Sequence, residues 1–227
     1  MQITEIYKSI QGESTHAGLP CVFVRLTGCN LRCSWCDSEY TFTGGQRRTL
    51  EEVAAEVNRL SPNGGLVEIT GGEPMLQERE VVPLMQHLLD AGYTVLLETS
   101  GERPLKQVPR QVIKIVDVKC PNSGEPDTFH MENLETLSSQ DEVKFVLSDR
   151  ADYEFARDFV RQHSLDQRVK AVLFSPAFSK DARGARDASY CLVDPRELAD
   201  WILADSVPAR LGLQIHKFIW DPAMKGV

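Results

Sequence analysis

The chain has 227 residues, of which 42% are hydrophobic and 26% are charged, which is typical of a globular protein with a full apolar core. Its formal net charge of −8 excludes a broadly basic surface for nucleic acid, although a local pocket for a small anion remains open. No stretch has the apolar length of a membrane helix, and residues 1–12 lack the apolar run of a signal peptide. We therefore expect one domain over residues 1–227, in the cytoplasm, without a nucleic-acid or membrane partner.

In chain order, short apolar runs alternate with amphipathic helices. The first run, residues 22–26, predicts a buried strand that ends at a cysteine-rich loop. A capping-box pattern at residues 49–52 predicts the start of the first helix, and Asp194 followed by Pro195 predicts the start of the last one. The other strands are expected at residues 66–70, 94–98, 112–118, 142–147, 169–174 and 210–214, and the helices at 50–60, 80–90, 149–163 and 195–204.

Alternating strands and helices predict an α/β fold with a mostly parallel sheet and right-handed crossovers. The motifs that carry chemistry all follow the end of a predicted strand, where the functional residues of such sheets gather. The strands are too few for a complete eight-fold barrel, so we expect a reduced, incomplete TIM-type barrel with few helices. The motifs at strand ends are the cysteine loop and residues 71–74, 98–101, 117–119 and 175–176.

Three of the six cysteines, Cys29, Cys33 and Cys36, lie within eight residues. Without a signal peptide we expect a reducing compartment, in which these thiols are free to bind metal. A [4Fe–4S] cluster takes four ligands, so three cysteines leave one iron open for a non-protein ligand. The amine and carboxylate of S-adenosylmethionine can bind there, and one electron from the cluster can then release a deoxyadenosyl radical.

Two other interpretations of the cysteine loop stay open. A zinc site could recruit His16 as a fourth ligand, and a plain electron-transfer cluster could recruit Cys120. For Cys21, Cys120 and Cys191 the ordinary expectation is a small buried hydrophobic residue. His16 and His216 are expected to be surface or satisfied core histidines.

The spacing Cys-x3-Cys-x2-Cys after a first strand, with Trp35 before the last cysteine, resembles the signature of the radical S-adenosylmethionine enzymes. The run Gly71-Gly72-Glu73-Pro74 is similar to the second motif of that superfamily, in which glycines let the backbone approach the ligand closely. Further segments resemble the 7-carboxy-7-deazaguanine synthase family, across nearly the whole chain. These segments are residues 9–14, 18–20, 23–25, 28–31, 35–38 and 213–217.

The resemblance implies a lyase that converts 6-carboxy-5,6,7,8-tetrahydropterin to 7-carboxy-7-deazaguanine with loss of ammonia, in the pathway to queuosine and related 7-deazapurines. It implies a [4Fe–4S] cluster, S-adenosylmethionine that is regenerated in each turnover, and Mg²⁺. It also implies a homodimer and an electron donor such as flavodoxin or ferredoxin.

The resemblance assigns site residues one at a time. Arg25 matches an arginine that pairs with the substrate carboxylate, and an arginine within an apolar strand needs a buried anionic partner. Ser38 matches the Mg²⁺ position, usually threonine, and keeps the hydroxyl oxygen that a hard cation needs. The catalytic cluster ligands are Cys29, Cys33 and Cys36; the substrate residues are Ile10, Gln11, Gly12, Glu13, Arg25 and Thr70; and the cofactor residues are Trp35, Cys36, Asp37, Gly72, Asp117, Val118, Lys119, Ser175, Pro176, Ala177 and Phe178.

Some assignments and alternatives remain open at this point. Glu98 either contacts the ribose of the cofactor or fixes the end of a strand. Ten residues follow Lys217, which leaves open whether Val227 reaches the site. A glycyl-radical enzyme activase is the alternative function, but it gives no reason for Gln11 and Glu13 or for Arg25. A non-enzymatic iron–sulfur carrier is the third hypothesis.

Overall fold

The computed structural model describes residues 1–180, 187–222 and 224–227 of the chain. Its strands are β1 (Gln2–Ile10), β2 (Pro20–Leu26), β3 (Gln46–Arg47), β4 (Gly65–Gly71), β5 (Tyr93–Thr99), β6 (Ile113–Asp117), β7 (Glu142–Leu147), β8 (Ala171–Pro176) and β9 (Arg210–Leu211). Its α-helices are α1 (Leu50–Leu60), α2 (Glu78–Asp90), α3 (Arg150–His163), α4 (Pro195–Asp205) and the short α5 (His216–Ile219).

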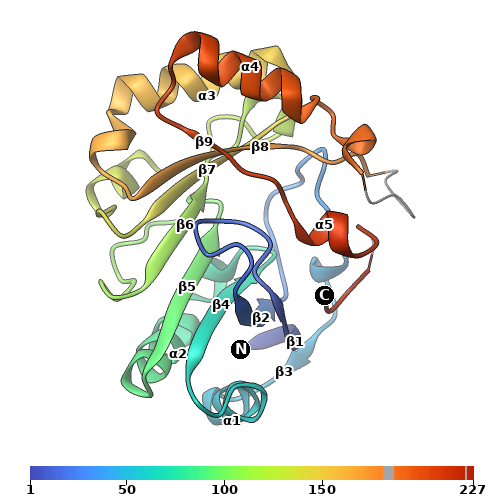
Figure 1. Cartoon of the computed structure of the whole chain (residues 1–227). Helices are drawn as coiled ribbons and strands as arrows, with labels where there is room; N and C mark the ends of the chain where they lie inside the picture. Colours follow the sequence, from blue (N-terminus) through green and yellow to red (C-terminus); the bar gives the residue numbers. More distant parts are fainter. Residues whose placement is uncertain (181–186, 223) are drawn as a thin grey trace.

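The strands form one sheet in the order β3-β1-β2-β4-β5-β6-β7-β8-β9. From β2 to β9 all neighbours pair in parallel, whereas β1 pairs antiparallel with both β2 and β3. The sheet curves without closing (Figure 1), so β3 and β9 are its two edges within the described part of the chain. The predicted incomplete barrel with a mostly parallel sheet and few helices is therefore confirmed.

The two faces of the sheet carry different side chains because successive residues of a strand point to opposite sides. On the outer face, one apolar cluster packs against α1 and α2 and a second packs against α3 and α4, and Figure 1 shows the two helix pairs at opposite ends of the sheet. On the inner face, Phe23, Leu66 and Leu96 form a smaller apolar cluster. Arg25 and Thr70 follow these residues toward the C-terminal ends of their strands and line a pocket.

Helices α1, α3 and α4 begin where the sequence predicts, whereas α2 begins at Glu78, two residues earlier than predicted. Thr49 caps α1 with a complete capping box, in which its hydroxyl accepts the Glu52 N–H at 3.2 Å and the Glu52 carboxylate accepts the Thr49 N–H at 2.8 Å. Asp149 and Asp194 cap α3 and α4 by accepting a backbone N–H in the first turn. These caps fix where each helix starts on the outer side of the sheet.

The sequence-based strand assignment needs correction at the two ends of the sheet. It does not include β1 or β3, because β1 mixes Glu5 and Lys8 with apolar residues and shows no continuous apolar run. It also extends β9 to residue 214, whereas the strand ends at Leu211. Cys21 is buried as expected, but Cys191 is partly exposed, so the expectation of a buried residue is wrong there.

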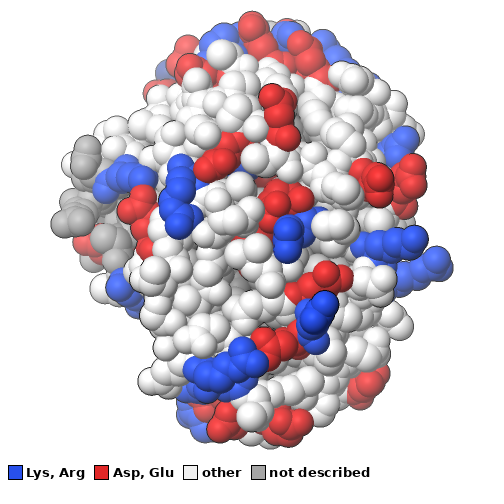
Figure 2. All heavy atoms as spheres, turned by 180° about the vertical axis from the view of Figure 1, so that it is seen from behind, with Lys and Arg blue, Asp and Glu red and all other residues white. Residues whose placement is uncertain are grey.

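The surface shows a mixture of charges. On the face seen in Figure 2, Lys and Arg side chains are interspersed with Asp and Glu. Within the described residues, no helix combines the length and the apolar character needed to cross a bilayer. Several charged side chains of the strands are buried, among them Glu68 and Lys144.

Candidate active site

A pocket lies on the inner face of the sheet, toward the C-terminal ends of the strands. Its walls combine the loop after β1, the cysteine loop after β2, the ends of β4 to β7, and the segment around α5. These segments are far apart in the sequence and meet because parallel strands end at one edge of the sheet. The structure therefore shows the predicted convergence for the cysteine loop and for the motifs at the ends of β4, β5 and β6, but not for residues 175–176, which do not line the pocket.

The three thiols of the cysteine loop, Cys29, Cys33 and Cys36, are free, half-buried and line this pocket together. Burial raises the pKa of Cys33 to about 11 and also raises the pKa of Cys29, so a positive metal is needed to hold them as thiolates. Among the described residues, no three His, Cys, Asp or Glu side chains converge closely enough to bind one metal ion. The loop therefore fits a multi-iron cluster, in which each cysteine binds a different iron, better than a single-ion site.

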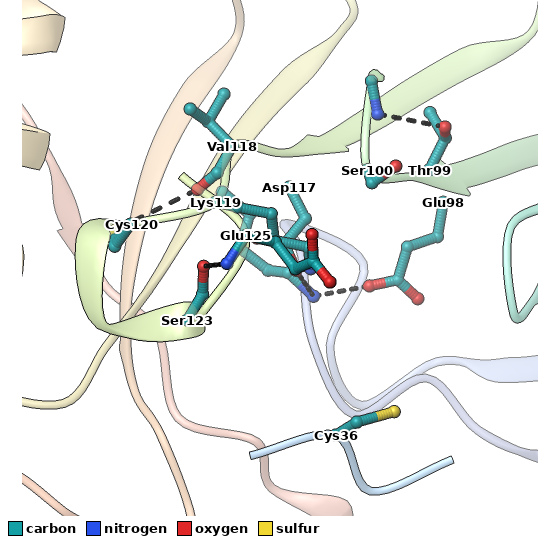
Figure 3. A network of polar contacts seen from close by, with 12 residues as sticks. Cys36, Glu98, Thr99, Ser100, Asp117, Val118, Lys119, Cys120, Ser123 and Glu125 are labelled. Atoms are coloured by element: carbon teal, nitrogen blue, oxygen red, sulfur yellow. Dashed lines mark hydrogen bonds and ion pairs between the residues drawn. The ribbon is translucent and has the colours of Figure 1, made fainter. Parts of the chain in front are cut away.

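The fourth ligands of the alternative interpretations lie elsewhere. Cys120 is buried among the apolar side chains of the outer face, with its Sγ 4.0 Å from the Val118 carbonyl oxygen. Figure 3 shows it turned away from the space between Glu98, Lys119 and Cys36. His16 lies outside the pocket that the cysteines line. The structure therefore offers neither residue to the three thiols.

The glycines of the Gly71–Pro74 turn are required by the chain itself. A Cβ added at Gly71 would lie 2.4 Å from the Leu26 carbonyl oxygen, and one added at Gly72 would lie 2.1 Å from the Gly28 carbonyl oxygen. The turn is also hydrogen-bonded to the start of the cysteine loop, through Gly72 N–H to Leu26 O (3.2 Å) and Glu73 N–H to Gly28 O (2.8 Å). The sequence predicts that these glycines let the backbone approach a ligand. The structure adds a second reason for them, because they also allow the turn to pack against the cysteine loop and hydrogen-bond to it.

Glu73 fixes the neighbouring strand end. Its carboxylate is buried and accepts hydrogen bonds from the Met75 N–H, the Thr99 hydroxyl, and both the N–H and the hydroxyl of Ser100, all between 2.7 and 2.9 Å. Burial raises the pKa of Glu73, although these donors act in the opposite direction. Glu73 therefore has a structural role that connects the turn after β4 to the end of β5.

A buried lysine organises the carboxylates of the pocket. Lys144 Nζ on β7 lies 2.7 Å from Glu13 Oε2 and 2.5 Å from Glu98 Oε1, and its side chain is 4% exposed. Burial alone would raise the pKa of Glu13, but Lys144 and then His216 lower it to about 2. The Thr70 hydroxyl donates to Glu98 at 3.2 Å. Glu98 is thus an ion-pair partner within the pocket, a role that the sequence analysis did not consider.

Arg25 has its anionic partner within the chain. Its Nε lies 3.0 Å from Glu5 Oε1 and its Nη2 donates to the Tyr7 hydroxyl at 2.9 Å, while the Tyr40 hydroxyl also donates to Glu5 at 2.7 Å. Burial of Arg25 therefore does not by itself require a ligand, which corrects the argument from the sequence. Arg25 still lines the pocket, so its contact with a substrate carboxylate stays a prediction.

Asp117, the last residue of β6, and Lys119, two residues beyond it, both line the pocket. Lys119 Nζ lies 2.7 Å from Asp117 Oδ2, and Figure 3 shows both beside Glu98. The other oxygen, Asp117 Oδ1, is buried and has no hydrogen-bond partner among the described residues. Because a buried unpaired acceptor is costly, this atom fits a site that receives a donor from a cofactor.

The segment around α5 closes another side of the pocket. Lys217 is buried, and its Nζ lies 2.6 Å from Asp37 Oδ2 and 5.1 Å from the centroid of the Phe178 ring. A Cβ added at Gly12 would lie 2.0 Å from His216 Nδ1, so glycine is needed there for the close approach of His216. Residues 224, 226 and 227 also line the pocket. Val227, whose position the sequence leaves open, therefore reaches the pocket.

Most of the predicted site residues line the pocket: Ile10, Gln11, Gly12, Glu13, Arg25, Cys29, Cys33, Trp35, Cys36, Asp37, Ser38, Thr70, Gly72, Asp117, Lys119 and Phe178. Val118 instead packs in the outer apolar cluster. Ser175, Pro176 and Ala177 are buried at the end of β8 and do not line the pocket. Contact of these four residues with the cofactor stays a prediction.

Lys144, Glu68 and the Glu5–Tyr7–Tyr40 group are parts of the site that the predictions from sequence do not include. The available signal was a charged residue at an inward position of an apolar strand, as in Val67-Glu68-Ile69 and Val143-Lys144-Phe145. Such a residue must find a polar partner on the inner face. The strand β1, which carries Glu5 and Tyr7, gives no comparable signal.

Comparison with known proteins first identifies the class. A model of the Radical SAM superfamily matches residues 23–173, so the chain is a radical S-adenosylmethionine protein. It is 67% identical over 227 residues to the 7-carboxy-7-deazaguanine synthase of Koribacter versatilis (strain Ellin345), covering 100% of both chains. It is 38% identical to that of Chlorobaculum tepidum, covering 100% of this chain and 97% of the relative.

A solved structure shows the same fold. The crystal structure of QueE from Escherichia coli superimposes with a TM-score of 0.71 at 23% identity, covering 93% of this chain and 92% of that one. The identity to the sequence relatives assigns the family: the chain belongs to the 7-carboxy-7-deazaguanine synthase family.

Proposed function

We propose that this protein is a 7-carboxy-7-deazaguanine synthase, which contracts the ring of 6-carboxy-5,6,7,8-tetrahydropterin with loss of ammonia. The observation that carries the proposal is the set of three free thiols on one loop, facing a pocket that also contains Arg25 and the Lys144 network. The identity of 67% over the whole chain to a synthase supports the same conclusion. It favours this function over a glycyl-radical enzyme activase and over an iron–sulfur carrier.

Several residues that line the pocket would hold the cofactors. Cys29, Cys33 and Cys36 would bind a [4Fe–4S] cluster, and Asp117 with its unpaired Oδ1 would accept a donor from S-adenosylmethionine. When bound, the two cofactors supply the radical that starts the ring contraction. Gly72 would lie against S-adenosylmethionine, because the turn that contains it is bonded to the cysteine loop.

The remaining pocket residues would bind and orient the substrate. Arg25 offers a guanidinium to the 6-carboxylate and is held in position by Glu5 and Tyr7. Lys144 keeps Glu13 ionised, so that the Glu13 carboxylate remains an acceptor at the pH of the cell. Charge of both signs at fixed positions suits a ligand with a carboxylate at one end and N–H groups on a ring.

Mg²⁺ would bind next to the substrate through Ser38. The Ser38 residue precedes the turn Glu39–Thr41, but its hydroxyl makes no capping hydrogen bond to that turn, and it lines the pocket 3.7 Å from the Cys36 Sγ. A hydroxyl that is not used for capping remains available to a hard cation.

The wider assignments follow from the same function. We infer a single domain over residues 1–227 that works as a homodimer in the cytoplasm and receives electrons from a flavodoxin or a ferredoxin. Size-exclusion chromatography with light scattering tests the dimer, and reduction of the cluster by each purified electron carrier tests the donor.

Anaerobic turnover tests the function. The reconstituted protein, with reductant, S-adenosylmethionine and Mg²⁺, should convert 6-carboxy-5,6,7,8-tetrahydropterin to 7-carboxy-7-deazaguanine, measured by mass spectrometry. Cleavage of S-adenosylmethionine without any deazaguanine product would contradict the assignment and leave only the radical class.

A further inference from the structure

Glu68 is a buried carboxyl group in the pocket with no assigned role. It lies on the inner face of β4, is 3% exposed and lines the pocket. Its Oε2 accepts a hydrogen bond from Gln11 Nε2. Among the described residues, no hydrogen bond reaches its other oxygen, Oε1. The side chain is nearly buried but lines the pocket, so the partner that such a carboxyl oxygen is expected to find can come from a bound ligand.

The orientation of the Gln11 amide is fixed from its other end. The Glu13 N–H donates to Gln11 Oε1 at 2.7 Å, so the amide nitrogen of Gln11 must face Glu68. Glu68 therefore has to present an acceptor oxygen to Gln11. This leaves Oε1 as the atom that faces a ligand.

The charges around Glu68 disfavour a further negative charge. Glu98 on β5 and Glu13 after β1 are already paired with Lys144 on β7, and Arg25 on β2 is paired with Glu5, with Tyr7 on β1 also nearby. Burial, followed by the carboxylates of Glu98 and Glu13, raises the pKa of Glu68 well above its usual range, against the effects of Lys144 and Arg25. Glu68 is thus placed to keep its proton, as carboxylic acids do in some apolar active sites.

We propose that Glu68 binds the substrate as a neutral carboxylic acid: its Oε2 accepts the Gln11 amide, and the O–H on Oε1 donates to an acceptor atom of the pterin ring. The proposal rests on the proposed function, since it takes a carboxypterin as the substrate.

The position of Glu68 fits a ring held between two sites. Arg25 is paired in register with Thr70, and Glu68 precedes Thr70 by two residues on the same face, a spacing of about 6.6 Å along the strand. Arg25 would hold the carboxylate toward the mouth of the pocket. Glu68 would then meet the ring deeper, beside Phe23, its register partner on β2.

The matched pair Glu68→Gln and Glu68→Met tests this role. Glu68→Gln must turn its carbonyl oxygen toward Gln11, so its NH₂ group replaces the O–H as a donor to the ring. Glu68→Met keeps a similar length but has no donor. Glu142→Gln is the control, because Glu142 is an equally buried carboxyl of the inner face that accepts from Thr15 and lies outside the pocket.

The probe is pterin-6-carboxylate, a fluorescent and redox-stable ring, titrated anaerobically into the reconstituted protein at about pH 7. We expect Glu68→Gln and Glu142→Gln to bind within about 3-fold of the wild type, and Glu68→Met to bind about 5- to 150-fold more weakly, the range for an unmet buried hydrogen bond. Wild-type affinity in Glu68→Met, or equal losses in Glu68→Gln and Glu68→Met, would overturn the proposal.

Infrared spectroscopy gives a second test, in which the decisive signal is recorded on the wild-type protein. The wild type should show the C=O stretch of a protonated carboxylic acid that shifts when pterin-6-carboxylate binds and that Glu68→Gln lacks. A wild-type spectrum without a ligand-sensitive acid band would overturn the proposal. Failure of turnover in a wild type that binds the probe as described would instead count against the proposed function alone.

Discussion

Replacement of Lys144 by methionine tests how far the pocket depends on one buried cation. The variant keeps a side chain of similar length but removes the partner of Glu13 and Glu98, which lie 2.7 and 2.5 Å from Lys144 Nζ. Leaving buried carboxylates without their cation costs about 3–5 kcal/mol. In a chain of this length each kcal/mol lowers Tm by about 2–4 °C, so we expect a fall of roughly 6–20 °C near neutral pH.

The same change should alter the pH dependence of stability. In the wild type the pKa of Glu13 is lowered to about 2 in the folded state, so its stabilisation is present above its ordinary pKa and is lost as the pH falls toward 2. This shift corresponds to about 3 kcal/mol. Without Lys144, burial raises the pKa of Glu13, and the variant gains stability as the pH falls. The difference in Tm should therefore be largest near neutral pH and shrink toward about pH 5.

Thermal unfolding of the reconstituted proteins, followed anaerobically by circular dichroism at several pH values, measures both effects. Lys114→Met is the matched control, because Lys114 is also buried and pairs with Asp141 at 2.9 Å, but outside the pocket. It should lose stability while keeping the substrate KM, whereas Lys144→Met should raise the KM as well. A Tm for Lys144→Met within about 2 °C of the wild type, or a difference that widens on acidification, would refute the reasoning.

Three further substitutions test other parts of the site. Cys33→Ala should remove the cluster and all activity, seen as a loss of bound iron and of the visible absorption; retention of a full cluster would contradict the ligand assignment. Arg25→Ala should keep the cluster but weaken substrate binding by about 2–5 kcal/mol, the range for truncating a buried charge pair, and an unchanged KM would argue against its role. Gly72→Ala should lower cluster occupancy, since its Cβ would lie 2.1 Å from the Gly28 carbonyl oxygen. Gly92→Ala is the control, because no atom lies within 4 Å of the Cβ added there. It should lower the free energy of unfolding by only about 1–2 kcal/mol, the cost of a left-handed backbone, and keep full cluster occupancy.

The central strands and helices are predictable because their outward residues must be apolar. Val22 and Val24, or Val67 and Ile69, pack against helices, and the caps Thr49 and Asp194 mark where helices start. The strand β1 is not predictable in the same way. Its Glu5 pairs with Arg25 on the next strand, and a contact between two strands cannot be read from the sequence of one of them.

The candidate site, too, is predictable from the sequence only in part. The cysteine loop and the turn at Gly71 are local patterns, and the structure brings both to one pocket. The Lys144 network depends on Glu13 and Glu98, which are separated from Lys144 by 131 and 46 residues. Such contacts follow from the curvature of the sheet, so the sequence indicates the chemistry of the site but not the charges that surround the substrate.

The proposed chemistry requires that the three cysteines hold a cluster with one iron left open for S-adenosylmethionine. Electron paramagnetic resonance of the reduced, reconstituted protein, recorded anaerobically with and without S-adenosylmethionine, tests it most directly. We expect the signal of a reduced [4Fe–4S] cluster whose g-values change when S-adenosylmethionine is added. A spectrum that stays the same at saturating S-adenosylmethionine would contradict it.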